Sequence, residues 1–449
     1  MSDKSHALKD LESRNSNSLL SVAIVGSGPA GFYAAEALAA ADVSVSIDIL
    51  DRLPTPYGLV RAGVAPDHQS MKKVTKRYEK AALNEKIEFF GNVFVGKDIS
   101  LDELREHYDA VILATGAPVD RTLGIPGDDK SGIIGSGEFV GWYNSHPDFI
   151  DLDPDFNVSS VAIIGNGNVA IDVARVLAKT PKEMEQSDLA DYAAERIHSA
   201  PISDIWMFGR RGPMEASFTP KELGEMGDLE DCSAIVAAGQ LPDEAYARTE
   251  KELRIKTKIL DHLKSFSKNQ PREKGKDLHL IFYARPVEVL GSDHVTGLRL
   301  EKTQVEDGKC VGTGQTFEIP CQMVISCIGY RSVPVPGAPF HEGWGLIPNE
   351  IGVVEKGLYV VGWIRRGPTG TIGTNRPDAQ QIVSQILEDE KPAGKDGRKG
   401  FVALLEARGI AYVTFDSWRK IERAEEAAAK GLAPRVKFAH IEDMLKVAK

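Results

Sequence analysis

Two glycine-rich turns in this sequence have the spacing needed to hold the pyrophosphate of a dinucleotide. The first, GSGPAG, carries Gly26, Gly28 and Gly31 after a short apolar strand and before an alanine-rich helix. In such a turn the first glycine permits a tight bend, the second lets the backbone approach a phosphate, and the third lets the helix pack on the strand. The next apolar stretch, VSIDILD, ends at Asp51, whose carboxylate can accept hydrogen bonds from unmodified ribose hydroxyls. The first turn therefore predicts a site for FAD or NAD.

The second turn, GNGNVA, is followed by the opposite ribose chemistry. Gly165 and Gly167 occupy the two glycine positions, and Ala170 occupies the third, which is a permitted variant. The strand that should follow is delayed by an insertion and is expected at DIWMFG, which leads directly into Arg210 and Arg211. A carboxylate would repel a 2′-phosphate, whereas guanidinium groups bind it through paired, charge-assisted hydrogen bonds. The second turn therefore predicts NADPH binding, although two arginines alone could simply cap a surface strand.

Two dinucleotide sites with opposite ribose chemistry indicate a flavoenzyme with FAD in the first site and NADPH in the second. Tandem NAD binding is the alternative, but it has no obvious chemistry. The stretch VILATG, which contains Thr115, is typical of flavoproteins that bind two dinucleotides. A third flavin contact is expected at GLYVVGWIRRGPTG, where a strand delivers Trp363 and a glycine-rich turn.

The elements that must position these residues alternate short apolar strands with helical patterns, which predicts an α/β fold. We expect two Rossmann-like dinucleotide-binding domains in a glutathione-reductase-like arrangement, with the NADP domain inserted in the FAD domain. Residues 20–118 and 328–449 would form the FAD domain, residues 119–327 the NADP domain, and residues 1–19 a disordered tail. The stretch that follows GLYVVGWIRRGPTG contains a helical pattern from Asp378 to about Leu387.

Composition excludes several other classes. The net charge of −11 over 449 residues argues against nucleic-acid binding, and no apolar run reaches membrane-spanning length. The first twenty residues lack secretory and mitochondrial signals, so a cytoplasmic location is expected. The four cysteines form no C-x-x-C pair and no metal-ligand spacing. We therefore expect reduced thiols, no metal site and no disulfide-reductase chemistry.

Five motifs carry a more specific resemblance: GSGPAGFYAAE, PYGLVRAGVAPDHQSMKKV, GNGNVAIDVAR, GRRGPMEASFTPKELGEM and GWIRRGPTGTIGTN. In this order they resemble the adrenodoxin-reductase type of ferredoxin–NADP reductase. The resemblance spans most of the chain, and the C-terminal LLEARGIAYVTFDSWRKIE also fits. It is lost over residues 228–320, which leaves partner contacts open.

The resemblance implies contacts residue by residue. FAD contacts would come from Ala30, Asp51, Leu59, Val95, Trp363, Gly370, Thr371 and Ile372. NADP contacts would come from Asn166, Asn168, Arg210, Arg211, Glu222 and Gly370. His68 and Asp172 match a pair linked to proton and water networks between the domains, and with Glu222 they form the expected catalytic group. Structural roles stay open: a turn histidine for His68, and helix-dipole or first-turn acids for Asp172 and Glu222.

The implied reaction is hydride transfer from NADPH to FAD, followed by two single-electron transfers to a small acidic ferredoxin of the 2Fe–2S or a similar type. A cytochrome P450 is a candidate for the final acceptor. An acidic partner requires a local basic surface. Lys221, Arg254 and Lys258 are the docking candidates, and Arg254 and Lys258 lie one helical turn apart. A solvated helix without a partner is the alternative. We expect a monomer or a weak dimer.

Three further classes compete with this interpretation. A flavin monooxygenase requires F-x-G-x-x-x-H, but FVGWYNSH has one residue too many between Gly141 and His146. The electron-distributing subunit of glutamate synthase adds a cysteine-rich iron–sulfur domain that is absent from this sequence. An NADPH-sensing binding protein would be colourless, whereas the predicted flavoenzyme would be yellow and would be bleached by NADPH.

Overall fold

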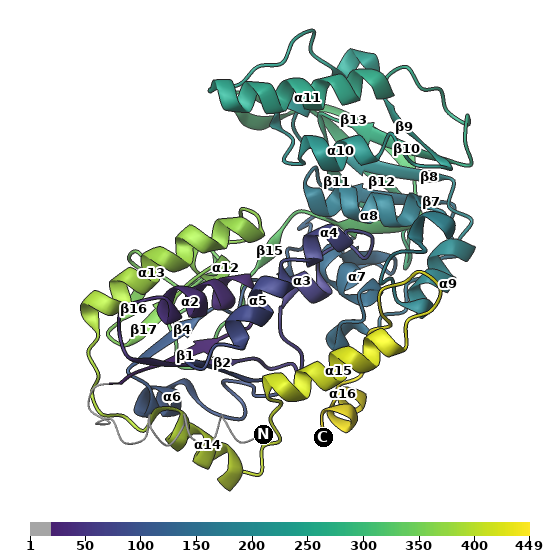
Figure 1. The fold of residues 1–449 in the computed structure, drawn as a ribbon. Helices are drawn as coiled ribbons and strands as arrows, with labels where there is room; N and C mark the ends of the chain where they lie inside the picture. Colours follow the sequence, from purple (N-terminus) through teal and green to yellow (C-terminus); the bar gives the residue numbers. More distant parts are fainter. Residues whose placement is uncertain (1–18) are drawn as a thin grey trace.

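The structure, a computed structural model, describes residues 19–449 and contains two six-stranded sheets (Figure 1). The expected disordered tail, residues 1–19, lies outside the described residues except for its last member. The first sheet has the order β16-β17-β4-β1-β2-β3 and is parallel except between β16 and β17. Its strands are β1 (Leu20–Val25), β2 (Val45–Leu50), β3 (Ile87–Phe90), β4 (Ala110–Leu113), β16 (Val353–Glu355) and β17 (Leu358–Val360).

Helices cover both faces of the first sheet, which explains why its strands are continuously apolar. One face packs against α2 (Pro29–Ala39), α5 (Thr75–Ala82), α13 (Asn375–Asp389), α15 (Phe415–Ala427) and α16 (Ile441–Ala448). The other face packs against α6 (Leu101–His107) and α14 (Gly397–Ala407). The remaining short elements of this half are α3 (Leu59–Ala62), α4 (Gln69–Lys72), α12 (Trp363–Arg366) and the 3-10 helix η6 (Ile372–Thr374).

The second sheet is parallel throughout and has the order β6-β14-β7-β8-β10-β9. Its strands are β6 (Ile133–Gly135), β7 (Ser160–Ile164), β8 (Asp204–Phe208), β9 (Cys232–Val236), β10 (Lys276–Ile281) and β14 (Met323–Ser326). The strand expected at DIWMFG is confirmed: β8 lies next to β7, after an insertion that contains α9 (Asp191–Ser199).

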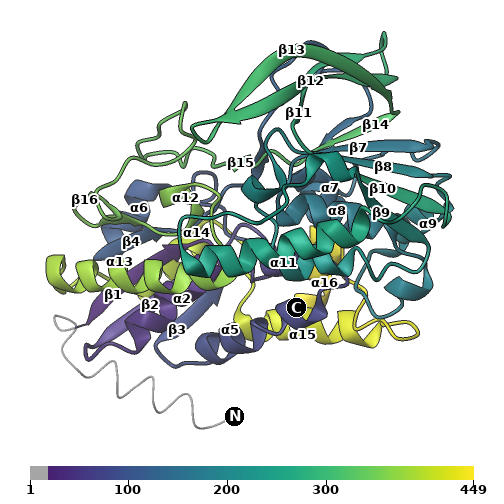
Figure 2. The same ribbon diagram turned by 90° about the horizontal axis from the view of Figure 1, so that it is seen from above.

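The two faces of the second sheet are covered differently. Five helices pack on one face: α7 (Ser136–Tyr143), α8 (Asn168–Ala178), α9 (Asp191–Ser199), α10 (Pro220–Glu225) and α11 (Glu250–Phe266). The other face carries an antiparallel sheet of β11 (Ala284–Leu290), β12 (Gly297–Glu306) and β13 (Lys309–Pro320), which lies at the top of Figure 2. Four 3-10 turns complete this half: η2 (Pro147–Phe149), η3 (Lys182–Met184), η4 (Pro213–Glu215) and η5 (Ala238–Gln240).

Two chain segments connect the halves and run side by side. They form the short antiparallel pair β5 (Val119–Asp120) and β15 (Tyr330–Arg331). The Asp120 carboxylate accepts hydrogen bonds from the backbone N–H groups of Gly137 and Glu138, at the start of α7. The paired segments are thereby attached to the second half.

The predicted α/β fold is confirmed, with one adjustment. The helix expected from Asp378 to about Leu387 begins earlier, at Asn375, and ends at Asp389. Pro377 lies in its first turn, where the backbone N–H groups have no partner within the helix, so proline does not stop the helix from starting there.

Candidate functional site

In the first glycine turn, the protein backbone packs closely against Gly26 and Gly31 but leaves open space next to Gly28. A Cβ on Gly31 would lie 2.0 Å from the Gly26 carbonyl oxygen, and a Cβ on Gly26 would lie 2.5 Å from the carbonyl oxygen of Ala114. Gly28 has no neighbour within 4 Å of an added Cβ. The turn therefore leaves space at Gly28, where a pyrophosphate would meet the start of α2.

Other segments expected to contact FAD converge on the same turn. An added Cβ on Gly58, next to Leu59, would lie 3.0 Å from the Gly28 Cα. An added Cβ on Gly362, next to Trp363, would lie 2.6 Å from the Cβ of Ala30. The structure thus brings Leu59, Ala30 and Trp363 to one place from segments far apart in the sequence.

Thr115 and Asp51 offer polar groups beside this turn. The Oγ1 of Thr115 is buried and has no hydrogen-bond partner among residues 19–449, so it is available to a ligand. The Asp51 carboxylate accepts hydrogen bonds from the Ser27 N–H at 3.0 Å, the Ser27 hydroxyl at 2.5 Å and the Leu53 N–H at 3.0 Å. These bonds hold it at the end of β2, the position expected for a ribose acceptor, and the donor set fits FAD.

The remaining residues expected at FAD occupy two segments. Val95 is buried shortly after β3. Gly370, Thr371 and Ile372 form the turn that leads into α13, and Gly370 has φ +84°, a conformation that favours glycine. Trp363 donates from Nε1 to the Thr369 carbonyl oxygen at 3.1 Å and stacks on Tyr330. This turn is therefore connected to the segments that join the two halves.

The second glycine turn repeats the same geometry. Gly165 has φ +143°, and an added Cβ would lie 2.3 Å from the Cys327 carbonyl oxygen, whereas Gly167 faces open space. The Asn166 side chain lies over Gly209, where an added Cβ would be 1.7 Å from Nδ2. A side chain at position 209, directly before the two arginines, would require the Asn166 side chain to move.

The loop that follows Arg210 and Arg211 is tied to this turn by hydrogen bonds. Asn168 Oδ1 accepts from the Thr219 N–H at 2.8 Å, and the Ser217 N–H donates to the Asn166 carbonyl oxygen at 2.8 Å. Arg210 is exposed and Arg211 half-buried, and neither guanidinium has an ion-pair partner in the described part of the chain. Two unpaired guanidinium groups beside an open glycine turn fit a phosphorylated ribose.

The three residues expected to be catalytic meet at the boundary between the halves. His68, 6% exposed, precedes α4. Its Nδ1 lies 3.7 Å from Asp172 Oδ1 on α8, and its Nε2 lies 3.5 Å from Glu222 Oε2 on α10. Thr219 caps α10 by accepting from the Glu222 N–H, so Glu222 is a first-turn residue of its helix as well as a neighbour of His68.

Three further charged residues complete this cluster, and sequence reasoning did not single them out. Arg175, fully buried on α8, lies 2.7 Å from Asp67 Oδ2 through Nε and 2.8 Å from Asp172 Oδ1 through Nη2. His68 Nε2 lies 2.8 Å from Glu225 Oε2. All three residues stand inside the quoted motifs: Asp67 before His68, Arg175 three positions after Asp172, and Glu225 three positions after Glu222. A spacing of three residues places two side chains on the same face of a helix, so this spacing could have identified Arg175 and Glu225 from the sequence.

The acids of the cluster respond oppositely to this environment. Burial raises the pKa of Asp172 above its ordinary value, and the nearby Arg175 and His68 only partly oppose this. Burial likewise raises the pKa of Glu222. Burial would also raise the pKa of Asp67, but the hydrogen bonds and charge of Arg175, together with Lys179, lower it well below its usual range. The site therefore combines Asp67, whose carboxyl loses its proton more readily than usual, with two carboxyls that retain theirs more readily.

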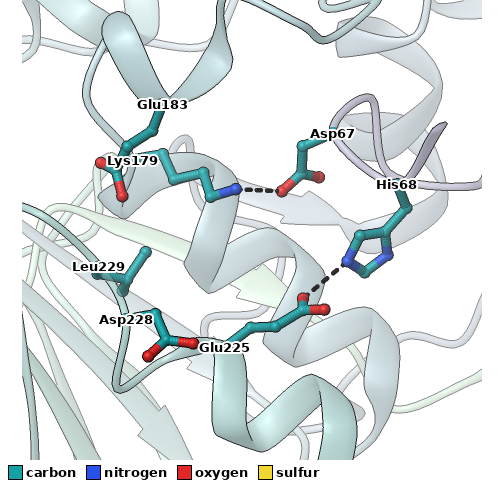
Figure 3. Close-up of a pocket in the computed structure, with 7 residues that line it drawn as sticks. All are labelled: Asp67, His68, Lys179, Glu183, Glu225, Asp228 and Leu229. Atoms are coloured by element: carbon teal, nitrogen blue, oxygen red, sulfur yellow. Dashed lines mark hydrogen bonds and ion pairs between the residues drawn. The ribbon is translucent and has the colours of Figure 1, made fainter. Parts of the chain in front are cut away.

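A cavity of about 210 Å³ opens next to His68 (Figure 3). Its lining residues are Asp67, His68, Lys179, Glu183, Glu225, Asp228 and Leu229. Lys179 Nζ lies 2.9 Å from Asp67 Oδ2 on one side, and His68 contacts Glu225 on the other. His68 thus stands between this polar cavity and the half-buried Asp172.

The ligand atoms of His68, Asp172 and Glu222 lie close enough together to hold a metal ion. However, Nη2 of Arg175 lies 2.8 Å from Asp172 and Nη1 lies 3.6 Å from Glu222, so a guanidinium already provides positive charge there. A second group, Asp204, Asp277 and His279, is paired with Arg272 in the same manner. In each group an arginine already neutralises the carboxylates, so the side chains are better suited to these ion pairs than to a resident metal ion.

The docking candidates are accessible. Lys221 lies on α10 with its side chain 65% exposed, Arg254 lies on α11 with 82% exposed, and Lys258 follows one turn later on the same face. All four cysteines are free, and none pairs with another. Within residues 19–449, no helix combines the length and the apolar composition that crossing a bilayer requires.

Known proteins resemble this chain over nearly its whole length. Residues 20–208 match the family model described as pyridine nucleotide-disulphide oxidoreductase. The NADPH-ferredoxin reductase FprA of Mycobacterium leprae is 41% identical over 448 residues, which cover 95% of this chain and 98% of that protein. The human mitochondrial NADPH:adrenodoxin oxidoreductase is 37% identical over 458 residues, with 95% and 91% covered. The solved structure of Mycobacterium tuberculosis FprA in complex with NADPH has a TM-score of 0.90 and 38% identity, and the match covers 96% of this chain and 99% of that one.

Proposed function

The chain belongs to the family of NADPH-ferredoxin reductases and NADPH:adrenodoxin oxidoreductases, and we propose that it passes electrons between NADPH and a ferredoxin. The family assignment confirms the resemblance drawn from the sequence: the protein is an oxidoreductase that uses FAD and NADP(H). When bound, the two cofactors supply the chemistry, because hydride from the nicotinamide reduces the flavin and the electrons then leave singly.

One contrast carries the proposal. Asp51 stands beside one open glycine turn, while Arg210 and Arg211 stand beside the other. A carboxylate suits a free ribose and guanidinium groups suit a phosphorylated one, so one chain selects two different dinucleotides. No cysteine pair stands near either turn, which supports electron transfer to a protein acceptor rather than disulfide reduction.

We assign FAD to the first half, residues 20–118 and 328–449, and NADP to the second, residues 119–327. The FAD residues are Gly26, Gly28, Ala30, Gly31, Asp51, Leu59, Val95, Thr115, Trp363, Gly370, Thr371 and Ile372. The NADP residues are Gly165, Asn166, Gly167, Asn168, Arg210, Arg211, Glu222 and Gly370. The glycine turns bind phosphate through backbone N–H groups, and the arginines orient the adenosine end.

The group formed by His68, Asp172 and Glu222 handles protons at the boundary between the halves. Glu222 Oε2 is buried without a hydrogen-bond partner among the described residues, which leaves it free to accept a bond from the nicotinamide end of NADPH. His68 contacts acids of α8 and α10 and borders the cavity, so it can exchange a proton with solvent.

The electron acceptor is an acidic ferredoxin, and a cytochrome P450 is a candidate for the final acceptor. Lys221, Arg254 and Lys258 provide exposed positive charge on a chain whose net charge is −11. Electrostatic complementarity of this kind raises the rate of encounter. We propose a monomer or weak dimer in the cytoplasm.

The test is a reconstituted electron-transfer assay. The purified protein should be yellow, NADPH should bleach it without oxygen, and an acidic ferredoxin should increase NADPH-driven cytochrome c reduction. A colourless protein that binds NADPH without turnover would instead identify a sensor. A yellow protein that reduces dithiols or oxygenates a substrate, with no response to any ferredoxin, would contradict the proposal.

A further inference from the structure

Arg175 contacts several charged side chains at the boundary between the two halves. Its side chain is fully buried on α8, yet it contacts groups from three segments. Nε and Nη2 donate to the two Asp67 carboxylate oxygens at 2.7 and 3.1 Å, which joins the second half to the loop before α4. Nη1 lies 3.6 Å from Glu222 Oε2 and 3.5 Å from Glu225 Oε2. Burying a guanidinium is costly unless acids surround it, and here they do.

The same side chain also approaches His68 directly. Arg175 Nη2 lies 3.4 Å from His68 Nδ1. A guanidinium carries only donors, so a hydrogen bond between these two nitrogens requires a lone pair on His68 Nδ1. A neutral His68 then carries its hydrogen on Nε2, where it donates to Glu225 Oε2 at 2.8 Å. The position of Arg175 thereby selects one of the two neutral forms of the imidazole.

This choice gives the two ring nitrogens different surroundings. Nε2 and Glu225 border the cavity that opens beside Asp67 (Figure 3). Nδ1 faces inward, 3.7 Å from Asp172 Oδ1. A proton on Nε2 can therefore exchange with water in the cavity, whereas Nδ1 is available to the buried side.

We propose that Arg175 is a positioning residue that holds His68 with its hydrogen on Nε2, toward Glu225 and the cavity, and keeps Nδ1 as the acceptor facing Asp172. The consequence for turnover rests on the proposed function, in which His68 handles a proton of the NADPH reaction. The placement of the hydrogen itself does not depend on turnover.

Lys179 provides a matched control for a purely structural role. It directly follows α8, four positions after Arg175, and also pairs with Asp67, at 2.9 Å, but it makes no contact with His68 in the described structure. If Arg175 serves only to attach the halves through Asp67, loss of Lys179 should resemble loss of Arg175. If Arg175 acts on His68, only Arg175 variants should change the imidazole.

The first experiment reads the imidazole directly in the holoenzyme. The protein is labelled with ¹⁵N-histidine, and the His68 signals are assigned by their loss in His68→Gln. Nuclear magnetic resonance distinguishes the protonated from the unprotonated ring nitrogen. We expect the Nε2–H form in the wild type and in Lys179→Met, and a mixture of both forms in Arg175→Lys and Arg175→Met. Arg175→Lys keeps the buried positive charge, so it remains informative if Arg175→Met does not fold.

The second experiment measures coupling between the two residues. NADPH-driven flavin reduction is followed in the wild type, Arg175→Lys, His68→Gln and the double variant. If Arg175 acts through His68, Arg175→Lys should lower the rate of flavin reduction about tenfold when His68 is present. It should cause no further loss when His68 is already replaced by glutamine. Equal losses in both backgrounds, or an unchanged Nε2–H form in Arg175→Lys, would overturn the proposal. A protein that fails to oxidise NADPH contradicts the proposed function, and the spectra then decide the position of the hydrogen alone.

Discussion

Lys437 Nζ lies 3.5 Å from Asp188 Oδ2, and the two side chains are only 1% and 4% exposed. Lys437 belongs to the segment between α15 and α16, while Asp188 belongs to the second half of the molecule. Lys72, from α4 of the first half, lies 2.6 Å from the other oxygen of Asp188. Lys437 also donates to Asn144 Oδ1 at 2.9 Å. One buried carboxylate therefore joins the C-terminal segment to both halves of the molecule, and α15, which leads into this segment, runs from the first half toward α9 of the second half in Figure 1.

This arrangement predicts an acid-sensitive contribution to stability. Burial by itself raises the pKa of Asp188, but Lys437 and Lys72 lower it overall to about 2. A carboxyl whose pKa is lower in the folded state stabilises the protein above its unfolded pKa of about 4 and loses that effect as pH falls toward 2. The shift corresponds to about 2–3 kcal/mol. Asp188→Asn should therefore lower the free energy of unfolding by about this amount at pH 7, and the difference should shrink below pH 4.

The measurement is urea unfolding followed by tryptophan fluorescence at pH 7, 5 and 3. Asp191→Asn is the control, because Asp191 also pairs with a C-terminal lysine, Lys430, but on the exposed surface. Its loss should cost less than about 1 kcal/mol at every pH. A difference between wild type and Asp188→Asn that stays constant with pH would contradict the role assigned to the carboxylate.

Substitution of the second and third glycines of the first turn, Gly28 and Gly31, should have different effects. In Gly31→Ala the new Cβ meets the Gly26 carbonyl oxygen at 2.0 Å, so α2 must move and the FAD-free protein should itself be destabilised by about 1–3 kcal/mol. In Gly28→Ala the methyl group enters open space, so the FAD-free fold should remain while FAD affinity falls about tenfold. Thermal unfolding without FAD and the flavin content of the purified protein separate the two effects. Equal loss of stability in both variants would show that Gly28 does not mark the ligand side of the turn.

The arginine pair should determine the choice of cofactor. Replacing both Arg210 and Arg211 by alanine removes the charge-assisted bonds to a 2′-phosphate and should raise KM for NADPH about 10–100-fold. KM for NADH should change little, because NADH has no phosphate at that position. Steady-state kinetics with a small artificial acceptor gives both values. Arg105→Ala, on α6 of the other half, is the control for arginine loss in general. An equal rise in KM for NADPH and NADH would contradict the assignment of Arg210 and Arg211 to the 2′-phosphate.

The exposed cations of α11 should act only on the protein acceptor. Arg254→Glu with Lys258→Glu should slow ferredoxin-dependent cytochrome c reduction about tenfold at low salt and leave NADPH-driven ferricyanide reduction unchanged. Added salt should narrow the difference from wild type, because screening weakens attraction between exposed charges. Arg423→Glu, on α15, controls for a change in total charge and is compared with Arg254→Glu alone, because each of these variants replaces one arginine by glutamate. If the ferredoxin rate responds equally to Arg423→Glu, docking does not occur at α11.

Much of this protein could be predicted from short stretches of sequence. The glycine turns, Asp51 and the Arg210–Arg211 pair are local signals, since each motif fixes a backbone geometry or a charge within a few residues of a strand end. The helix at residues 375–389 was found with displaced ends, because the first turn of a helix tolerates proline and gives little warning of where it begins. The sequence also predicted that Arg254 and Lys258 share one face of a helix, because residues four positions apart lie one helical turn apart.

Sequence by itself determined that the chain would bind two dinucleotides of opposite ribose chemistry, because those signals need only neighbouring residues. Only the tertiary structure decided how the halves meet. Arg175 and Asp67 are 108 positions apart, and Lys437 and Asn144 are 293 apart, yet each pair forms a buried contact. No local pattern distinguishes these charges from the many exposed ones. Burial does so, because a charge removed from water must have partners, and which partners it has depends on the folding of the whole chain.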